Sequence, residues 1–174
     1  MTGPTGPYPR MPGGGIARRP LHFIILADCS GGTKGEKIQA LNFAIADMLP
    51  HLAVWERDQE QAQVFIRAIA FATEPWWHMA EPQPVAELAW KPLQPVPKGL
   101  TNMGPAFALA AQALASGRIE RRALRPAMVL ITDGLATDPP GGFEAGADRG
   151  AVARRLLGPP GDAPSRIFDQ DTIV

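Results

Sequence analysis

The sequence predicts an α/β protein with a three-layer, doubly wound and mostly parallel sheet. A continuous apolar run of strand length at 21–27 is typical of a strand buried on both faces, and two further strands are predicted at 62–71 and 127–133. Segments with helical spacing of apolar residues, one starting at Gly35 and one at 105–117, separate these runs. This alternation favours parallel strands joined by helical crossovers.

The first strand and the helix that follows it have the clearest patterns. Residues 21–27, LHFIILA, contain no Asp, Glu, Lys or Arg and are predicted to lie at the centre of the sheet. Pro50 lies within the helical pattern, so we expect the helix to kink or end near Met48, because proline removes a backbone donor. The apolar positions of this helix are Ile38, Leu41, Ile45, Met48, Leu49 and Leu52.

The later elements are predicted from residue composition and from the positions of proline and glycine. The run 62–71 is rich in β-branched and aromatic residues and is predicted to be the second strand. Residues 75–97 contain six prolines, so only short edge-strand pieces are expected there. The alanine-rich run 105–117 is predicted to be a helix, with Pro105 in its first turn and Gly117 past its end.

Composition predicts one globular domain in a reducing compartment. The chain has 174 residues, of which 45% are hydrophobic, and 17 basic residues balance 17 acidic ones. This balance argues against a global attraction to nucleic acid or anionic lipid. No apolar run reaches the roughly 18 residues of a membrane helix. Cys29 is the only cysteine, so no intramolecular disulfide forms. We expect a cytoplasmic protein.

Three segments are expected along the chain. Residues 1–19, rich in Pro and Gly, are predicted to be a disordered leader without the hydrophobic region of a secretory signal. The domain core is expected at 20–138. Residues 139–174 are an atypical tail, predicted to be partly disordered, in which no buried strand follows the short run AVARRLL. The sheet is then expected to lack its last strands, which leaves an edge open to self-association or to a partner.

Carboxylates and hydroxyls follow the predicted strands. Asp28 and Asp133 end the first and third strands, Ser30 comes directly after the first, and Thr101 precedes the second helix. Ligand sites in open parallel sheets lie beyond the carboxyl ends of the strands, so these four side chains are expected to meet. Hard oxygen donors without His or Cys suit Mg²⁺ or Mn²⁺ rather than zinc.

The same residues carry a resemblance to a known family. Asp28-Cys-Ser30, the distant Thr101 and Ile-Thr-Asp133-Gly134 resemble the metal-ion-dependent adhesion site (MIDAS) of von Willebrand factor A (vWA) domains, whose pattern is Asp-x-Ser-x-Ser, a distant Thr and a distant Asp. The surrounding text, including KIQALNFAIADMLPHL, AIAFATEPWWH and LRPAMVLITDGLATD, is similar to bacterial cytoplasmic TerY-like proteins, which are associated with tellurite resistance and stress systems. The resemblance covers about residues 20–138.

The resemblance implies a non-enzymatic module that binds proteins through a divalent ion. Ser30 and Thr101 would supply hydroxyl ligands, and Asp28 and Asp133 would hold Mg²⁺ or Mn²⁺ directly or through water. An acidic side chain of a protein partner would complete the coordination. Family association implies that this partner would be a kinase or phosphatase encoded nearby.

Gly32 departs from the family pattern, because it stands where the family has its second serine. A lost charge-assisted contact of about 1.5–3 kcal/mol would weaken ion binding by roughly ten- to a hundredfold unless water fills the position. Thr33, one residue further on, would need a different backbone path to replace the hydroxyl. The alternative is a metal-free scaffold in which Asp28 and Ser30 only cap the loop and the helix.

A second alternative is a Mg²⁺-dependent phosphohydrolase or phosphotransferase in which Asp28 is the nucleophile. The haloacid-dehalogenase pattern that this stretch resembles needs an aspartate at position 30, where the chain has serine. Cys29 is expected to be a buried structural thiol. Three scattered histidines make a shared metal site improbable, and they are His22, His51 and His78.

Overall fold

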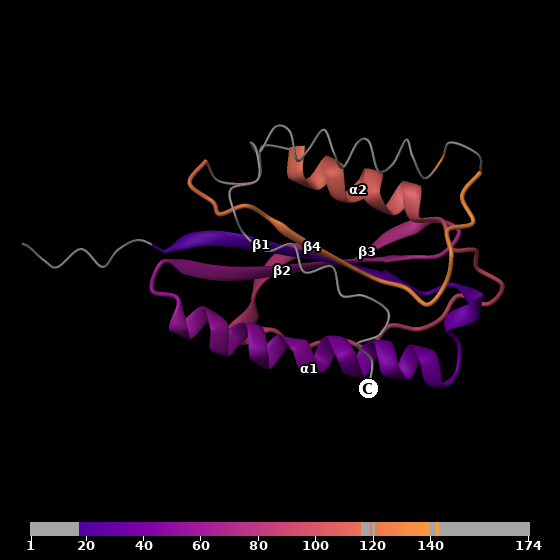
Figure 1. Ribbon diagram of the computed structural model, residues 1–174, viewed down its shortest axis with the longest axis horizontal. Helices are drawn as coiled ribbons and strands as arrows, with labels where there is room; N and C mark the ends of the chain where they lie inside the picture. The colour runs from indigo at the N-terminus through magenta and orange to yellow at the C-terminus, as the bar shows by residue number, and fades with distance from the viewer. Residues whose placement is uncertain (1–17, 116–118, 120, 140–141, 143–174) are drawn as a thin grey trace, which may run out of the picture.

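The computed structural model describes residues 18–115, 119, 121–139 and 142 (Figure 1). Within these residues, one sheet has the strand order β3-β2-β1-β4. β1 pairs in parallel with β2 and with β4, while β3 runs antiparallel to β2. The expected mixed α/β sheet with the first strand inside it is therefore confirmed. The strands are β1 (Arg19–Asp28), β2 (Ala62–Phe71), β3 (Pro75–Pro84) and β4 (Ala127–Ile131).

Two helices lie against opposite faces of the sheet, α1 (Glu36–Asp58) and α2 (Met103–Ala115), as Figure 1 shows. Side chains of β1 alternate between the two faces, since Ile25 packs in the cluster with α1 while Ile24 packs in the cluster with α2. Both are almost fully buried, which explains why this strand is apolar at successive positions.

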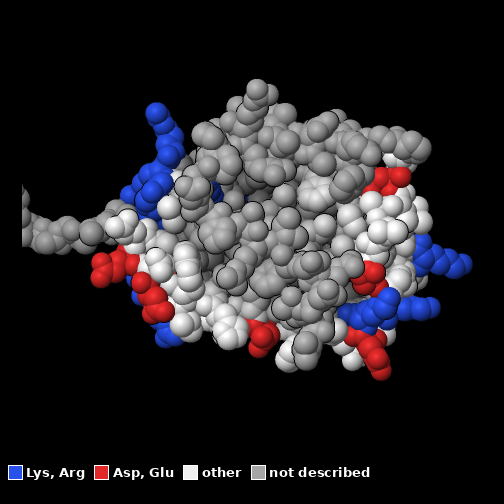
Figure 2. All heavy atoms as spheres, in the orientation of Figure 1, with Lys and Arg blue, Asp and Glu red and all other residues white. Residues whose placement is uncertain are grey.

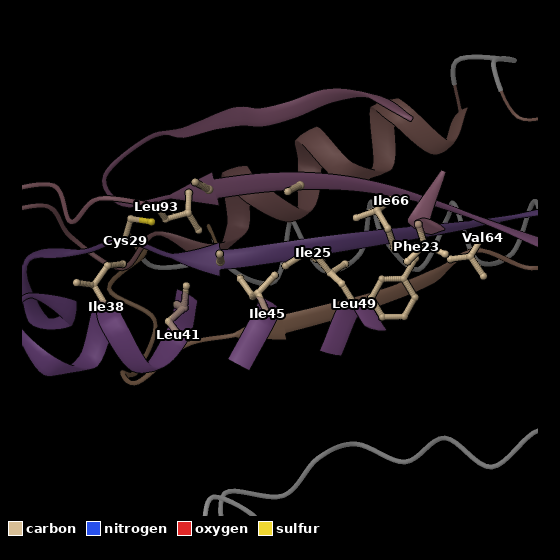
Figure 3. Packing of buried hydrophobic residues seen from close by; sticks show 14 residues of the cluster. Phe23, Ile25, Cys29, Ile38, Leu41, Ile45, Leu49, Val64, Ile66 and Leu93 are labelled. Carbon is tan, nitrogen blue, oxygen red and sulfur yellow. The ribbon is translucent and has the colours of Figure 1, made fainter. Parts of the chain in front are cut away.

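The cluster between α1 and the sheet forms the larger core (Figure 3). Ile38, Leu41, Ile45 and Leu49 of α1 lie along β1 and β2, at the helical spacing that the sequence predicted. Burying an aliphatic side chain of this size contributes about 1.5–3 kcal/mol, so this stripe is enough to fix α1 on the sheet. The position of α1 then fixes the loop between β1 and the helix.

Pro50 does not end α1. The predicted helix end near Met48 is therefore wrong. The helix continues to Asp58 with Pro50 inside it. Pro50 itself is exposed, so water can reach the backbone on that side of the helix, while Leu49 beside it is buried against the sheet. Tertiary packing before and after the proline outweighs its local cost.

β3 is longer than the short edge-strand pieces that were predicted for 75–97. It spans ten residues at the outer edge of the sheet and begins and ends with proline. Its pairing with β2 shifts register around Ala68, which is typical of a bulged edge strand. A short 3-10 helix, η2 (Val85–Glu87), follows it. Pro105 lies in the first turn of α2, as predicted.

Parts of the predicted organisation lie outside the described residues. These are residues 1–17 of the predicted leader, Gly117, and almost all of the predicted tail at 139–174. β1 already begins at Arg19, one residue before the expected start of the core. Among the described helices, none is both long and apolar enough to cross a membrane. On the face shown in Figure 2, described basic and acidic side chains are intermixed at both ends of the molecule.

Candidate functional site

The predicted site residues lie at the edge of the sheet where β1 and β4 end. Asp28 is the last residue of β1, and Asp133 follows β4 after one intervening residue. Ser30 precedes the short 3-10 helix η1 (Gly31–Thr33), and Thr101 lies just before α2. Parallel pairing of β1 with β4 brings the two carboxylate-bearing ends to the same side.

Asp28 is fully buried, and both of its carboxylate oxygens accept hydrogen bonds. The backbone N–H of Ser30 donates to Oδ1 at 2.8 Å, and the hydroxyl of Thr132 donates to Oδ2 at 2.6 Å. Two donors on a buried carboxylate hold it in a single orientation. The role of Thr132 was missed at the sequence level, although its position directly before Asp133 was the available signal.

The side chains of Ser30 and Asp133 both approach Gly32. A Cβ atom built on Gly32 would lie 3.9 Å from the hydroxyl oxygen of Ser30, and 3.9 Å and 4.0 Å from the carboxylate oxygens of Asp133. The structure thus brings Ser30 and Asp133 together around the position of the family's missing serine. This position has ordinary van der Waals space for a side chain.

Thr101 is joined to the loop that follows Asp133. Its N–H donates to the Thr137 hydroxyl at 2.8 Å, and the Thr137 N–H donates to the Thr101 carbonyl at 2.9 Å. A Cβ atom on Gly134 would lie 3.7 Å from the Thr101 hydroxyl oxygen. Thr101 therefore faces the residue next to Asp133, and the loops that carry all four predicted residues meet at one edge.

Thr33 does not replace the missing serine. Its hydroxyl donates to the carbonyl of Ser30 at 2.7 Å, and the residue is buried. This hydrogen bond stabilises the turn of η1 rather than presenting an oxygen to the site. A water molecule could take the position of the second serine of the vWA pattern, since Mg²⁺ usually keeps several waters.

Lys37 is a further charged residue at the site that sequence reasoning missed. Its Nζ lies 2.6 Å from Oδ2 of Asp133. Lys37 is the second residue of α1, and the contact joins residues that are 96 positions apart. Its signal in the sequence was its place in the first turn of the helix directly after the Asp28 loop.

Cys29 lies between Asp28 and Ser30 in the sequence, but its thiol is unreactive. The residue is buried in the core with α1 (Figure 3). Burial, and to a lesser extent the charge of Asp28, raises the pKa of the Cys29 thiol to about 12. The thiol therefore stays protonated at neutral pH, and the expectation of a buried structural cysteine is confirmed.

The donor set fits a hard divalent cation. Two carboxylates and nearby hydroxyls are oxygen donors, and Mg²⁺ is usually held by one or two carboxylates with several waters. Zinc prefers imidazole and thiolate ligands, and the four predicted residues supply neither. Their oxygen donors therefore suit Mg²⁺ or Mn²⁺ better than zinc.

Comparison with known proteins bears only on the fold. No protein-family profile matches the chain, and no curated protein matches it. Among solved structures, the chain is similar to the crystal structure of three N-terminal domains of the type V pili tip protein Mfa5 from Porphyromonas gingivalis, with a TM-score of 0.52 and 18% sequence identity. The similarity covers 68% of this chain and 20% of that chain, so this chain spans about a fifth of that length.

Proposed function

We propose that the chain is a vWA-like, non-enzymatic protein-binding module with a MIDAS-type site for Mg²⁺ or Mn²⁺. The observation that carries the proposal is the fixed carboxylate of Asp28 at the end of β1, with the side-chain oxygens of Ser30 and Asp133 both close to the Cβ position of Gly32. In this proposal the helices and sheet form the three-layer, doubly wound arrangement of the family. The TerY-like sequence segments support a role in a bacterial stress or tellurite-resistance system in the cytoplasm.

Each residue has a distinct task in this proposal. Asp28 is oriented by Ser30 and Thr132, so it presents a fixed negative charge without rearranging. Asp133 supplies the second carboxylate, and Ser30 and Thr101 supply neutral oxygens. When bound, the divalent ion supplies positive charge that an acidic side chain of the partner can share. The partner, a kinase or phosphatase encoded nearby, would then bind only through this edge of the sheet.

The phosphotransfer alternative has less support. An aspartate nucleophile must contact the phosphorus atom directly, whereas Asp28 is fully buried and both of its oxygens accept hydrogen bonds. A metal ion can be held by the same carboxylate through water, without direct contact. Ser30 also lacks the carboxylate that general acid–base catalysis would require at this position. No turnover of a generic phosphatase substrate is expected with Mg²⁺, and steady turnover that is lost in Asp28→Asn would favour this alternative.

The test is calorimetric titration of the full chain with Mg²⁺ and with Mn²⁺. Weak binding is expected for the wild type and none for Asp28→Ala. Because Asp28 is buried, Asp133→Asn serves as a second variant at a more accessible position, and circular dichroism checks the folding of both. Binding of the kinase or phosphatase encoded nearby is then compared in Mg²⁺ and in EDTA. Equal titrations for all three proteins, or no heat from any, would support the metal-free scaffold.

A further inference from the structure

The ion pair between Lys37 and Asp133 places a cation of the protein on a proposed metal ligand. The ammonium nitrogen lies 2.6 Å from Oδ2 of Asp133, which is hydrogen-bonding distance. The side chain of Asp133 is 28% exposed and that of Lys37 is 61% exposed. The pair is therefore accessible to water, and its ammonium can leave when another cation arrives.

The backbone holds Lys37 at this place. Gly35 precedes the helix with φ of 72°, a left-handed conformation that favours glycine, and no atom would contact a Cβ there. Ile38, next to Lys37, is buried in the core against β1. The first turn of α1 is thus fixed on the sheet, and Lys37 extends from a rigid point toward the loop after β4.

We propose that Lys37 is an internal counter-ion that competes with the divalent cation for Asp133 and so sets the ion affinity of the site. In the metal-free protein the ammonium neutralises Asp133 and keeps its loop in place. Ion binding requires this ammonium to move away from Oδ2, because two cations cannot share one carboxylate oxygen at hydrogen-bonding distance without strong repulsion. This inference rests on the proposed metal-binding function and adds the residue that regulates it.

Lys34 provides a matched control. It lies three residues before Lys37, in the segment between η1 and α1, and it carries the same charge and is exposed. Among the described residues it forms none of the ion pairs seen in the structure. Lys37→Met and Lys34→Met therefore remove the same charge from the same region, but only the first removes the cation that contacts Asp133.

The experiment is a titration of wild type, Lys37→Met and Lys34→Met with Mg²⁺ and with Mn²⁺ by calorimetry. We expect Lys37→Met to bind roughly tenfold more tightly than the wild type, since a unit charge about 4 Å from a divalent ion is repelled even in water. Lys34→Met should bind within about twofold of the wild type, because an exposed charge that makes no contact with Asp133 is largely screened. Thermal unfolding in EDTA gives a second readout, in which Lys37→Met should melt at a lower temperature than the wild type and recover when Mg²⁺ is added.

The outcomes separate this inference from the proposed function. Tighter binding by Lys37→Met alone supports it, as does binding by Lys37→Met when the wild type shows none. If the wild type binds clearly and Lys37→Met binds equally or more weakly, the counter-ion role is contradicted. The proposed metal site is still supported by that result. The absence of binding in all three proteins overturns both.

Discussion

The hydroxyl of Thr132 donates a hydrogen bond of 2.6 Å to Oδ2 of Asp28, which joins the loop after β4 to the end of β1. Thr132→Val removes this donor from a buried carboxylate at nearly constant volume. We expect a loss of about 1.5–3 kcal/mol in the free energy of unfolding, as for hydrogen bonds to charged groups. Urea unfolding in EDTA measures the loss. Thr132→Ser keeps the hydroxyl and is the control, and equal stability of the Val and Ser variants would contradict the prediction.

Gly32→Ser should restore the family's second hydroxyl. The built Cβ position is in ordinary contact distance of Ser30 and Asp133, so a Cβ atom fits there without displacing either. One recovered charge-assisted contact should tighten Mg²⁺ or Mn²⁺ binding by roughly ten- to a hundredfold. Gly32→Ala adds the same Cβ without the oxygen, and calorimetry should show no gain for it. Equal affinities for the Ser and Ala variants would show that the hydroxyl does not reach the ion.

Cys29 should make the folded protein less stable at alkaline pH. Its pKa is about 12 in the folded chain and 9.0 in the reference state, so between these values only the unfolded chain has lost the thiol proton. Unfolding is then favoured by up to about 1.4 kcal/mol for each pH unit above roughly 9. The contribution of Cys29 is fully present below this window. Cys29→Ala should show a shallower fall in stability from pH 9 to 11, and an unchanged slope would contradict the buried-thiol assignment.

Pro50→Ala should stabilise the protein. The variant restores a backbone N–H inside α1 at an exposed position, where no core packing changes. Helix propensity favours alanine over proline by about 3 kcal/mol, and the greater entropy of the unfolded variant offsets about 0.4–1 kcal/mol of this. A net gain of about 2–2.6 kcal/mol is expected in thermal or urea unfolding. A loss of stability would indicate that the helix needs the proline's geometry.

The buried strands were predictable because their pattern is local. LHFIILA lies between the apolar faces of two helices. Both faces of this strand are therefore buried, which requires apolar residues at successive positions. The continuation of α1 past Pro50 was not predictable in the same way, because it depends on which side of the helix faces solvent. The length of β3 depends on its pairing with β2. A prediction from the proline-rich composition alone therefore underestimates the length of this strand.

The four side chains of the candidate site could be placed near one another from the sequence, but the residues that hydrogen-bond to them could not. Asp28 and Asp133 were identified because strand ends of a parallel sheet meet at one edge. Thr132 and Lys37 act on these two residues across 104 and 96 positions of sequence, respectively. Such contacts depend on side-chain geometry in three dimensions. Composition and spacing do not determine it.

The prolines of β3 affect how the protein behaves at high concentration. An outer strand normally offers a row of backbone donors to any other extended chain, which is the first step of edge-to-edge aggregation. Pro75, Pro82 and Pro84 have no N–H, and the shifted register near Ala68 interrupts the regular pairing of this edge. Fibril growth by strand addition should therefore be blocked along β3, and replacing these prolines with threonine should make the protein more prone to aggregate.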